Sequence, residues 1–94
     1  MKAYWIAHVT VNSPDQYRHY AEAAREAFRK YNGRVLARGG RCEHLEGAGR
    51  PRNVVIEFDS YEDALACYNS PEYQAAKVKR QGAGEADIMI VEGV

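Results

Sequence analysis

The stretch AYWIAHVTVNSPDQY, residues 3–17, combines a strand pattern with a helix start directly after it. Ala3 to Val11 is rich in β-branched and aromatic residues, which favour strands, and Pro14 blocks further extension of a strand. Ser13 is suited to cap a helix, and Gln16 can reach back toward it as in a capping box. The stretch therefore predicts a strand over Ala3–Val11 followed by a helix that begins at Ser13.

The predicted first strand is apolar on both of its faces. Successive side chains of a strand point to opposite sides. One row holds Ala3, Trp5, Ala7, Val9 and Val11, and the other holds Tyr4, Ile6, His8 and Thr10. Neither row is typical of a water-facing surface. We therefore expect helices to cover one side of the sheet and a second copy of the chain to cover the other.

The first helix is predicted to pack its apolar stripe on the sheet and to end at Asn32-Gly33. The stripe consists of Tyr17, Tyr20, Ala21, Ala24, Phe28 and Tyr31. Charged residues, Arg25 among them, are expected on the opposite, solvent-facing side.

The remaining chain predicts three further strands and one interrupted helix. The strands are Arg34–Arg38, resumed at Arg41–Leu45, then Arg52–Asp59 and Ala86–Val91; Glu46–Pro51 is a turn or mobile loop. Gly39-Gly40 predicts a bulge, a bend or a close backbone approach. Ser60 and Ser70 are both expected to cap helices, and Gln81–Gly84 ends the second of these. The order β-α-β-β-α-β predicts a ferredoxin-like α+β fold, a four-stranded antiparallel sheet with the helices on one face, in a single domain over residues 1–94.

Composition narrows the function classes. Thirteen basic residues balance thirteen acidic ones, so the charge offers no footprint for nucleic acid or an anionic membrane. No segment approaches the roughly 20 apolar residues of a membrane helix, and we expect a cytoplasmic protein. The three histidines lack metal-ligand spacing, Cys42 and Cys67 are too few for a disulfide framework, and no dinucleotide fingerprint occurs. We therefore expect neither a metal nor a cofactor.

His8 and Arg38 are the two principal candidates for chemistry. His8 is able to act as a general base or hydrogen-bonding group near neutral pH, with Glu57 on another strand to orient it. The alternative is a histidine packed under a helix or at a dimer interface. Arg38 is able to bind a carboxylate or phosphate, while Gly39 allows close approach of a ligand. The alternative is a bulge in which Arg38 pairs with Glu57 or with an acid of a partner chain.

Tyrosines supply the candidate walls of a pocket. Seven tyrosines accompany only two phenylalanines, and Tyr20, Tyr68 and Tyr73 are predicted to face the sheet from the helices. Buried phenols usually have hydrogen-bond partners, so a polar, aromatic-lined cleft is one interpretation. The other is a rim of the core with hydroxyls at the surface. Arg52, Arg80 and Glu72 are expected to be salt-bridging or capping residues.

The chain also resembles a mostly bacterial family, domain of unknown function 1330, along nearly its whole length. The resemblance rests on Tyr4-Trp5-Ile6, Ser13-Pro14, Gly33-Arg34, Arg38-Gly39-Gly40, Glu46-Gly47, Ile56-Glu57-Phe58, Ser70-Pro71-Glu72-Tyr73, Arg80 and Glu92-Gly93. It implies a dimeric α+β barrel and no established activity. Cys67 departs from the family pattern, in which a tryptophan is expected before Tyr68, and this suggests a wider or more reactive pocket wall.

Together these observations predict a homodimer with a pocket for a small anionic organic molecule between helices and sheet. Arg38 would bind the anion, and His8 would support cofactor-independent proton transfer or oxygenase-like chemistry. The alternative is a non-catalytic binding protein or a structural interaction dimer. The positions of Arg38 and His8 distinguish the catalytic hypothesis from the binding hypothesis: an Arg38 that enters the cleft without His8 favours binding without catalysis.

Overall fold

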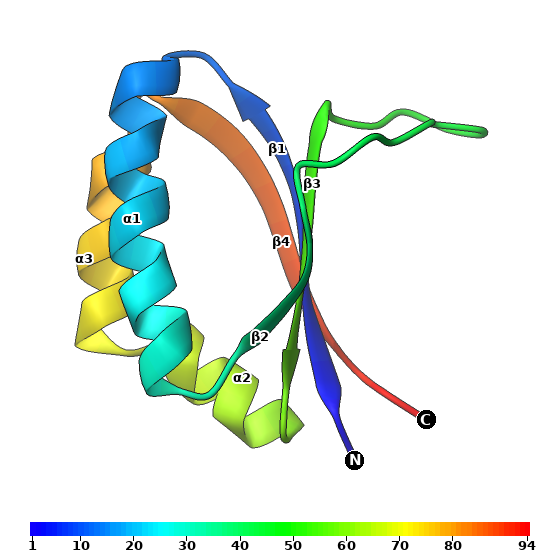
Figure 1. Cartoon of the computed structure of the whole chain (residues 1–94), viewed down its shortest axis with the longest axis vertical. Coiled ribbons are helices and arrows are strands. Elements are labelled where there is room, and N and C mark those ends of the chain that lie inside the picture. The colour runs from blue at the N-terminus through cyan, green and yellow to red at the C-terminus, as the bar shows by residue number, and fades with distance from the viewer.

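A computed structural model describes residues 1–94, and its elements alternate as the pattern predicts (Figure 1). The strands are β1 (Ala3–Val11), β2 (Arg34–Arg38), β3 (Arg52–Phe58) and β4 (Gly84–Glu92). The helices are α1 (Pro14–Lys30), α2 (Tyr61–Tyr68) and α3 (Pro71–Arg80). Each boundary lies within two residues of the predicted one, apart from the segment after β2.

The four strands form one antiparallel sheet in the order β2-β3-β1-β4, and the helices lie on one side of it (Figure 1). This is the predicted ferredoxin-like α+β fold. In the central strand β1, Trp5 lies opposite Ile56 of β3 and Ile90 of β4, so these three side chains share one face of the sheet. The β1 row of Ala3, Trp5, Ala7 and Val9 is buried under the helices.

The core between sheet and helices is built from aromatic rings around Trp5. The Trp5 ring meets Phe28 of α1 at a centroid distance of 5.0 Å and Tyr73 of α3 at 4.9 Å, both edge-on. Edge-on packing places the positive ring edge against the negative ring face and is favourable beyond simple burial. These contacts tie both long helices to the central strand.

The helix starts differ in how they are capped. The hydroxyls of Ser60 and Ser70 accept hydrogen bonds from the amides of Asp63 and Tyr73, as predicted. Ser13 occupies the cap position of α1 but makes no side-chain capping bond, so the capping box predicted there is wrong. Gln16 instead donates to the carbonyl of Gln81, which joins the start of α1 to the end of α3.

The segment after β2 is the main departure from the prediction. The strand expected to resume at Arg41–Leu45 does not form, and residues 39–51 make an exposed arm that projects beyond the sheet (Figure 1). The bulge lies earlier, between Val35 and Ala37. Arg50 ties the base of the arm to β4 through Asp87 and Glu85. Two adjacent glycines and too few apolar side chains leave this segment without a face to bury.

The sheet face away from the helices is only partly covered in a single chain. It carries the second row of β1, including Ile6 and His8, together with Val55 of β3 and Met89 and Val91 of β4. Met89 and Val91 are about half exposed (51% and 41%).

No helix has the length and apolar character needed to cross a membrane.

Candidate functional site

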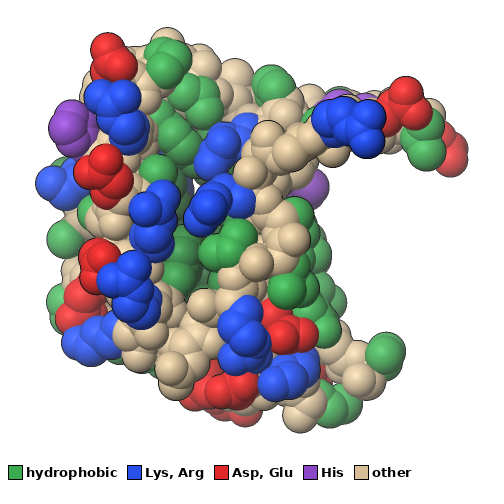
Figure 2. All heavy atoms as spheres, in the orientation of Figure 1, with side chains coloured by type: hydrophobic (Ala, Val, Ile, Leu, Met, Phe, Trp, Pro, Cys, Tyr) green, Lys and Arg blue, Asp and Glu red, His purple; other side chains and the backbone are tan.

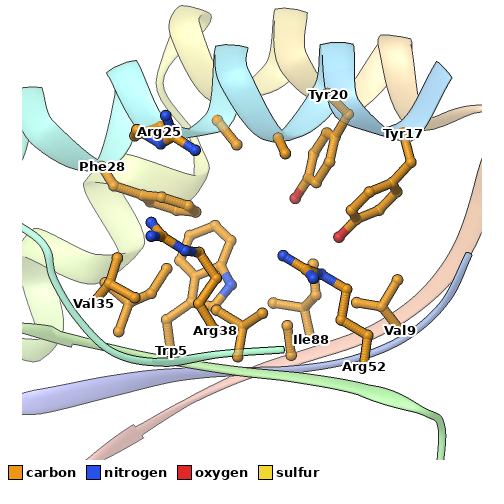
Figure 3. Close-up of a pocket in the computed structure, with 15 residues that line it drawn as sticks. Trp5, Val9, Tyr17, Tyr20, Arg25, Phe28, Val35, Arg38, Arg52 and Ile88 are labelled. Carbon is orange, nitrogen blue, oxygen red and sulfur yellow. The ribbon is translucent and has the colours of Figure 1, made fainter. Parts of the chain in front are cut away.

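A cavity of about 130 Å³ lies between α1 and the sheet (Figure 3). Its floor is apolar and formed by side chains of all four strands, among them Trp5, Val54, Ile56 and Ile88. Its roof is α1, which contributes Phe28 and the rings of Tyr17 and Tyr20. Figure 2 shows its mouth as a hollow between α1 and the sheet, with hydrophobic side chains at its floor.

Three arginines surround this cavity: Arg25 of α1, Arg38 of β2 and Arg52 of β3 (Figure 3). Figure 2 shows the basic side chains gathered on both sides of the hollow. The ion pairs of the chain involve other basic residues, and none includes any of these three. No aspartate, glutamate or histidine lines the cavity. The site therefore concentrates positive charge without a countercharge from the protein.

Arg52 is the most constrained of the three. Its guanidinium lies 5.6 Å from the centre of the Tyr17 ring, and its Nε atom is buried with no hydrogen-bond partner. The absence of a side chain at Gly39 leaves room for the Arg52 guanidinium. The φ of Gly39 is +67°, and a Cβ on Gly39 would collide with that guanidinium. Gly39 therefore makes room for the Arg52 side chain, and it does not line the cavity; the close approach of a ligand at Gly39 stays a prediction.

Tyr20, which lines the roof of the cavity, also belongs to a hydrogen-bonded triad with Tyr73 and Arg80. The two tyrosine hydroxyls lie 2.8 Å apart, and Nη1 of Arg80 donates to Tyr20 at 3.1 Å and to Tyr73 at 3.0 Å. Burial, and then the neighbouring Tyr73, raise the pKa of Tyr20 well above its ordinary value. Tyr20 is therefore a neutral phenol at physiological pH, fixed in place by α3.

The structure separates His8 from this cavity. His8 is exposed on the opposite face of the sheet, where Nδ1 lies 2.6 Å from Oδ1 of Asn53. Strand alternation causes the separation, since Trp5, Ala7 and Val9 occupy the face that lines the cavity. The expected meeting of His8 with Arg38 in one cleft does not occur.

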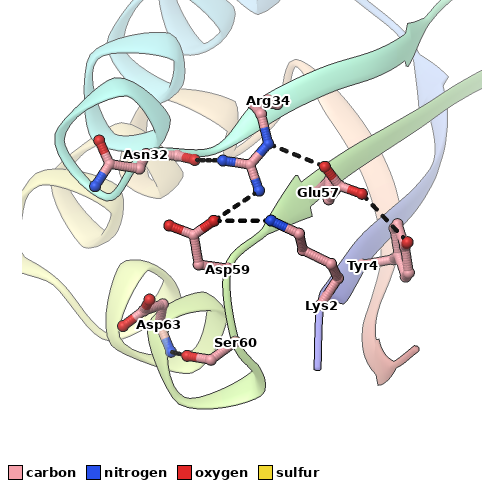
Figure 4. Close-up of polar contacts among 8 residues, drawn as sticks. All are labelled: Lys2, Tyr4, Asn32, Arg34, Glu57, Asp59, Ser60 and Asp63. Atoms are coloured by element: carbon pink, nitrogen blue, oxygen red, sulfur yellow. Dashed lines mark hydrogen bonds and ion pairs between the residues drawn. The ribbon is translucent and has the colours of Figure 1, made fainter. Parts of the chain in front are cut away.

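Glu57 lies on the same outer face as His8 and is used within the fold (Figure 4). Arg34 donates to it at 2.9 Å, and Tyr4 donates at 3.3 Å. The hydrogen bond from Arg34 lowers the pKa of the Glu57 carboxyl. Arg34 also contacts Asp59, which pairs with Lys2, so a small charged network crosses this end of the sheet (Figure 4). Glu57 neither enters the cavity nor pairs with Arg38.

Tyr68 and Cys67 also lie outside the cavity. The Tyr68 hydroxyl accepts a hydrogen bond from Lys77 at 3.0 Å, and Tyr68 lines a separate, open groove of about 460 Å³ beside β4. Cys67 is fully buried, its thiol is directed at the carbonyl of Ala27, and burial raises the pKa of that thiol to about 12. Cys67 thus does not widen the cavity wall, and its thiol is held protonated.

Sequence reasoning missed three residues of the cavity. Arg25 was expected on the solvent side of the first helix, yet it borders the apolar stripe next to Ala24 and lines the mouth. Arg52 was expected in a salt bridge, and Tyr17 was assigned only to the apolar stripe. The signal for Arg52 was strand alternation, because it shares the face of Val54 and Ile56 and is the one charged member of that row.

The fold and the cavity define a small ferredoxin-like α+β protein with a basic, apolar-floored site. The chain belongs to the family described as domain of unknown function (DUF1330), whose model matches residues 2–94. No curated protein matches the chain.

Solved structures share the fold at low sequence identity. A protein of unknown function from Rhodopseudomonas palustris is 18% identical with a TM-score of 0.70, covering 99% of this chain and 82% of that one. SnoaB, a cofactor-independent oxygenase from Streptomyces nogalater, is 8% identical with a TM-score of 0.68, covering 99% and 93%. A dimeric ferredoxin-like protein of unknown function from Thermobifida fusca is 18% identical with a TM-score of 0.58, covering 99% and 92%. At these identities the likeness extends to the fold alone.

Proposed function

We propose that the chain binds a small organic anion in the cavity between α1 and the sheet. The observation that carries the proposal is the trio Arg25, Arg38 and Arg52, which surrounds an apolar cavity without one acidic partner. Arg25 and Arg38 are exposed and Arg52 is partly buried, so their charges are open to solvent and attract a negative charge to the mouth of the cavity. A carboxylate supplies that charge and accepts the forked hydrogen bonds of a guanidinium.

The cavity volume limits the apolar part of the ligand. A dry apolar cavity of about 150 Å³ accommodates benzene, and the volume here is about 130 Å³. One six-membered ring or a branched aliphatic group therefore fills the floor against Trp5 and Phe28. The charged end then lies at the mouth, where the arginines are. The proposed ligand class is a monocyclic or short branched carboxylic acid.

Binding without turnover is the better-supported form of this proposal. Abstraction of a proton near neutral pH requires a base, and the polar side chains of the cavity lining are three arginines and two tyrosines, without a histidine or carboxylate. His8, the base expected from the sequence, lies on the other side of the sheet. Ligand binding requires only the groups that are present.

Cofactor-independent oxygenation is the second candidate, because SnoaB shares this fold and is described as such an oxygenase. A shared fold is weak support for shared chemistry. Oxygen uptake by the protein in the presence of a bound phenolic acid discriminates between the two. Uptake above the protein-free rate favours the oxygenase, and its absence with a ligand that demonstrably binds favours binding alone.

We also propose that the chain is a homodimer that packs through the sheet face opposite the cavity. Met89 and Val91 of β4 are about half exposed on that face, Ile6 of β1 and Val55 of β3 are partly buried beside them, and the similar Thermobifida fusca protein is described as dimeric. Placing a glutamate in this apolar row, as in Ile6→Glu, introduces a charge that pairing would bury. Light scattering should give twice the chain mass for the native protein and the single-chain mass for Ile6→Glu. A native protein of single-chain mass refutes the dimer.

A thermal-shift experiment tests the anion site with a matched pair of ligands. Benzoate and benzyl alcohol fill the cavity alike, but only benzoate carries charge. At a concentration about 100 times Kd, a bound ligand adds about 2.7 kcal/mol, or about 11–22 °C in a domain of this size. We expect benzoate to raise Tm for the native protein, benzyl alcohol to leave it nearly unchanged, and Arg38→Gln to lose the benzoate effect. Equal shifts with both ligands contradict the anion site.

A further inference from the structure

The hydroxyl protons of the triad Tyr20, Tyr73 and Arg80 can be assigned from the hydrogen bonds. Tyr73 is fully buried, and its only hydroxyl neighbours are Tyr20 and the Arg80 guanidinium. A guanidinium has no acceptor atom. The proton of Tyr73 therefore has a single available acceptor, the oxygen of Tyr20. The opposite assignment would leave the unpaired proton on Tyr73, which is fully buried, instead of on Tyr20, which lines the cavity, and it is therefore the less favourable of the two.

This assignment fixes the role of Tyr20. Its oxygen accepts from Tyr73 and from Arg80, and both lone pairs are then used. Its own proton has no acceptor within the protein, and the Tyr20 side chain extends from α1 into the cavity (Figure 3). Tyr20 therefore presents a hydrogen-bond donor to whatever occupies the cavity.

The polar groups around the cavity thus form a set dominated by donors. Arg38 and Arg52 approach from the sheet, while Tyr20 approaches from the helix on the other side, with the Tyr17 hydroxyl beside it (Figure 3). A simple carboxylate at the arginines leaves the Tyr20 proton unmatched. A ligand with a second oxygen acceptor next to its carboxylate matches both walls.

We propose that the cavity selects carboxylic acids that carry a carbonyl oxygen beside the carboxylate, that is, 2-oxo acids with one ring. This proposal rests on the proposed anion site and names its ligand class. Tyr20 is the specificity-determining residue, and Tyr73 and Arg80 position it. Burial of Tyr20, which keeps its phenol protonated, supports the donor role.

The test compares two ligands that differ only at the acceptor. Phenylglyoxylate and phenylacetate have the same ring, chain length and carboxylate, but the first has a carbonyl where the second has a methylene. Their Kd values are measured by isothermal titration calorimetry with the native protein, with Tyr20→Phe, and with Tyr31→Phe. Tyr31 is a tyrosine at the end of the same helix that does not line the cavity. The ratio of two affinities on one variant cancels any loss of folded protein.

We expect the native protein and Tyr31→Phe to bind phenylglyoxylate about 10-fold more tightly than phenylacetate, the effect of one net hydrogen bond. Tyr20→Phe should bring that ratio close to one while phenylacetate still binds. If Tyr20→Phe does not fold, the ratio of the two affinities measured on the native protein alone tests the proposal. A native ratio near one, or one unchanged in Tyr20→Phe, overturns the role of Tyr20 but leaves the anion site standing. Binding of neither acid overturns the proposed function itself.

Discussion

Replacing Arg52 by methionine should stabilise the protein while removing its ligand. The Nε atom of Arg52 is buried without a hydrogen-bond partner, and the side chain carries an unpaired charge at the cavity. Methionine is unbranched and flexible like the stem of arginine, and it has no N–H group that burial must desolvate. Arg52 is the one charged residue in a row with Val54 and Ile56, and the proposed anion site requires a charge at this position.

The magnitude follows from two opposing terms. A buried unsatisfied donor costs about 1–3 kcal/mol. The contact of the Arg52 guanidinium with the Tyr17 ring, at 5.6 Å, returns about 0.5–1 kcal/mol. The difference is a gain of about 1 kcal/mol for Arg52→Met, which corresponds to an increase of Tm by about 4–8 °C.

The assay is urea denaturation of the ligand-free protein followed by circular dichroism. Arg41→Met is the matched control, because Arg41 lies in the exposed arm and forms no ion pair. The control should change the free energy of unfolding by less than about 0.5 kcal/mol. If Arg52→Met lowers the free energy of unfolding by 1 kcal/mol or more, Arg52 serves the fold, and the reasoning is refuted.

Three further predictions concern the support of the site and the core. Gly39→Ala places a Cβ at positive φ and against the Arg52 guanidinium, so it should destabilise by about 1–2 kcal/mol and weaken benzoate binding, whereas Gly40→Ala, which meets open space, should do neither. Ser70→Ala removes both the cap on the Tyr73 amide and a 2.6 Å hydrogen bond to the Cys67 carbonyl, and should cost about 2 kcal/mol in urea denaturation. Ser13→Ala should cost under about 0.5 kcal/mol because its side chain makes no capping bond, and equal losses would contradict the cap assignment. Burial raises the pKa of Cys67 from 9.0 to about 12, so the unfolded chain loses this proton first as pH rises. The free energy of unfolding should therefore fall between pH 9 and about 12, by at most about 1.4 kcal/mol per pH unit from this group. Cys67→Ala should flatten that slope and the exposed Cys42→Ala should not; identical slopes in both variants would count against the assignment.

Local patterns predicted the fold because each element carries its own signal. The alternation in β1, the apolar stripe of α1 and the serine-proline starts are properties of short stretches, and they fix element type and order. The failure at Arg41–Leu45 has a physical cause. A strand depends on a neighbour and a face to bury, and the chain leaves the sheet after Arg38.

The site was harder to predict because it depends on which of two apolar faces the helices cover. Both rows of β1 were compatible with burial, so His8 and Trp5 were equally able to face the cavity. Trp5 packs against Phe28 and Tyr73, so the Trp5 row faces the helices and His8, in the other row, faces outward. Arg38 and Tyr20 lie at the cavity, whereas Arg25 and Arg52 resemble ordinary surface or salt-bridging residues until the cavity between the layers is known.

The most direct test of the account is a calorimetric titration of phenylacetate into the native protein, Arg52→Gln and Arg41→Gln. Both variants lose one positive charge and keep a polar side chain, but only Arg52 lines the cavity. We expect saturable binding to the native protein and to Arg41→Gln, and an affinity at least about 10-fold lower for Arg52→Gln. Equal affinity in all three proteins would show that the arginines around the cavity do not bind the anion, and it would contradict the central claim.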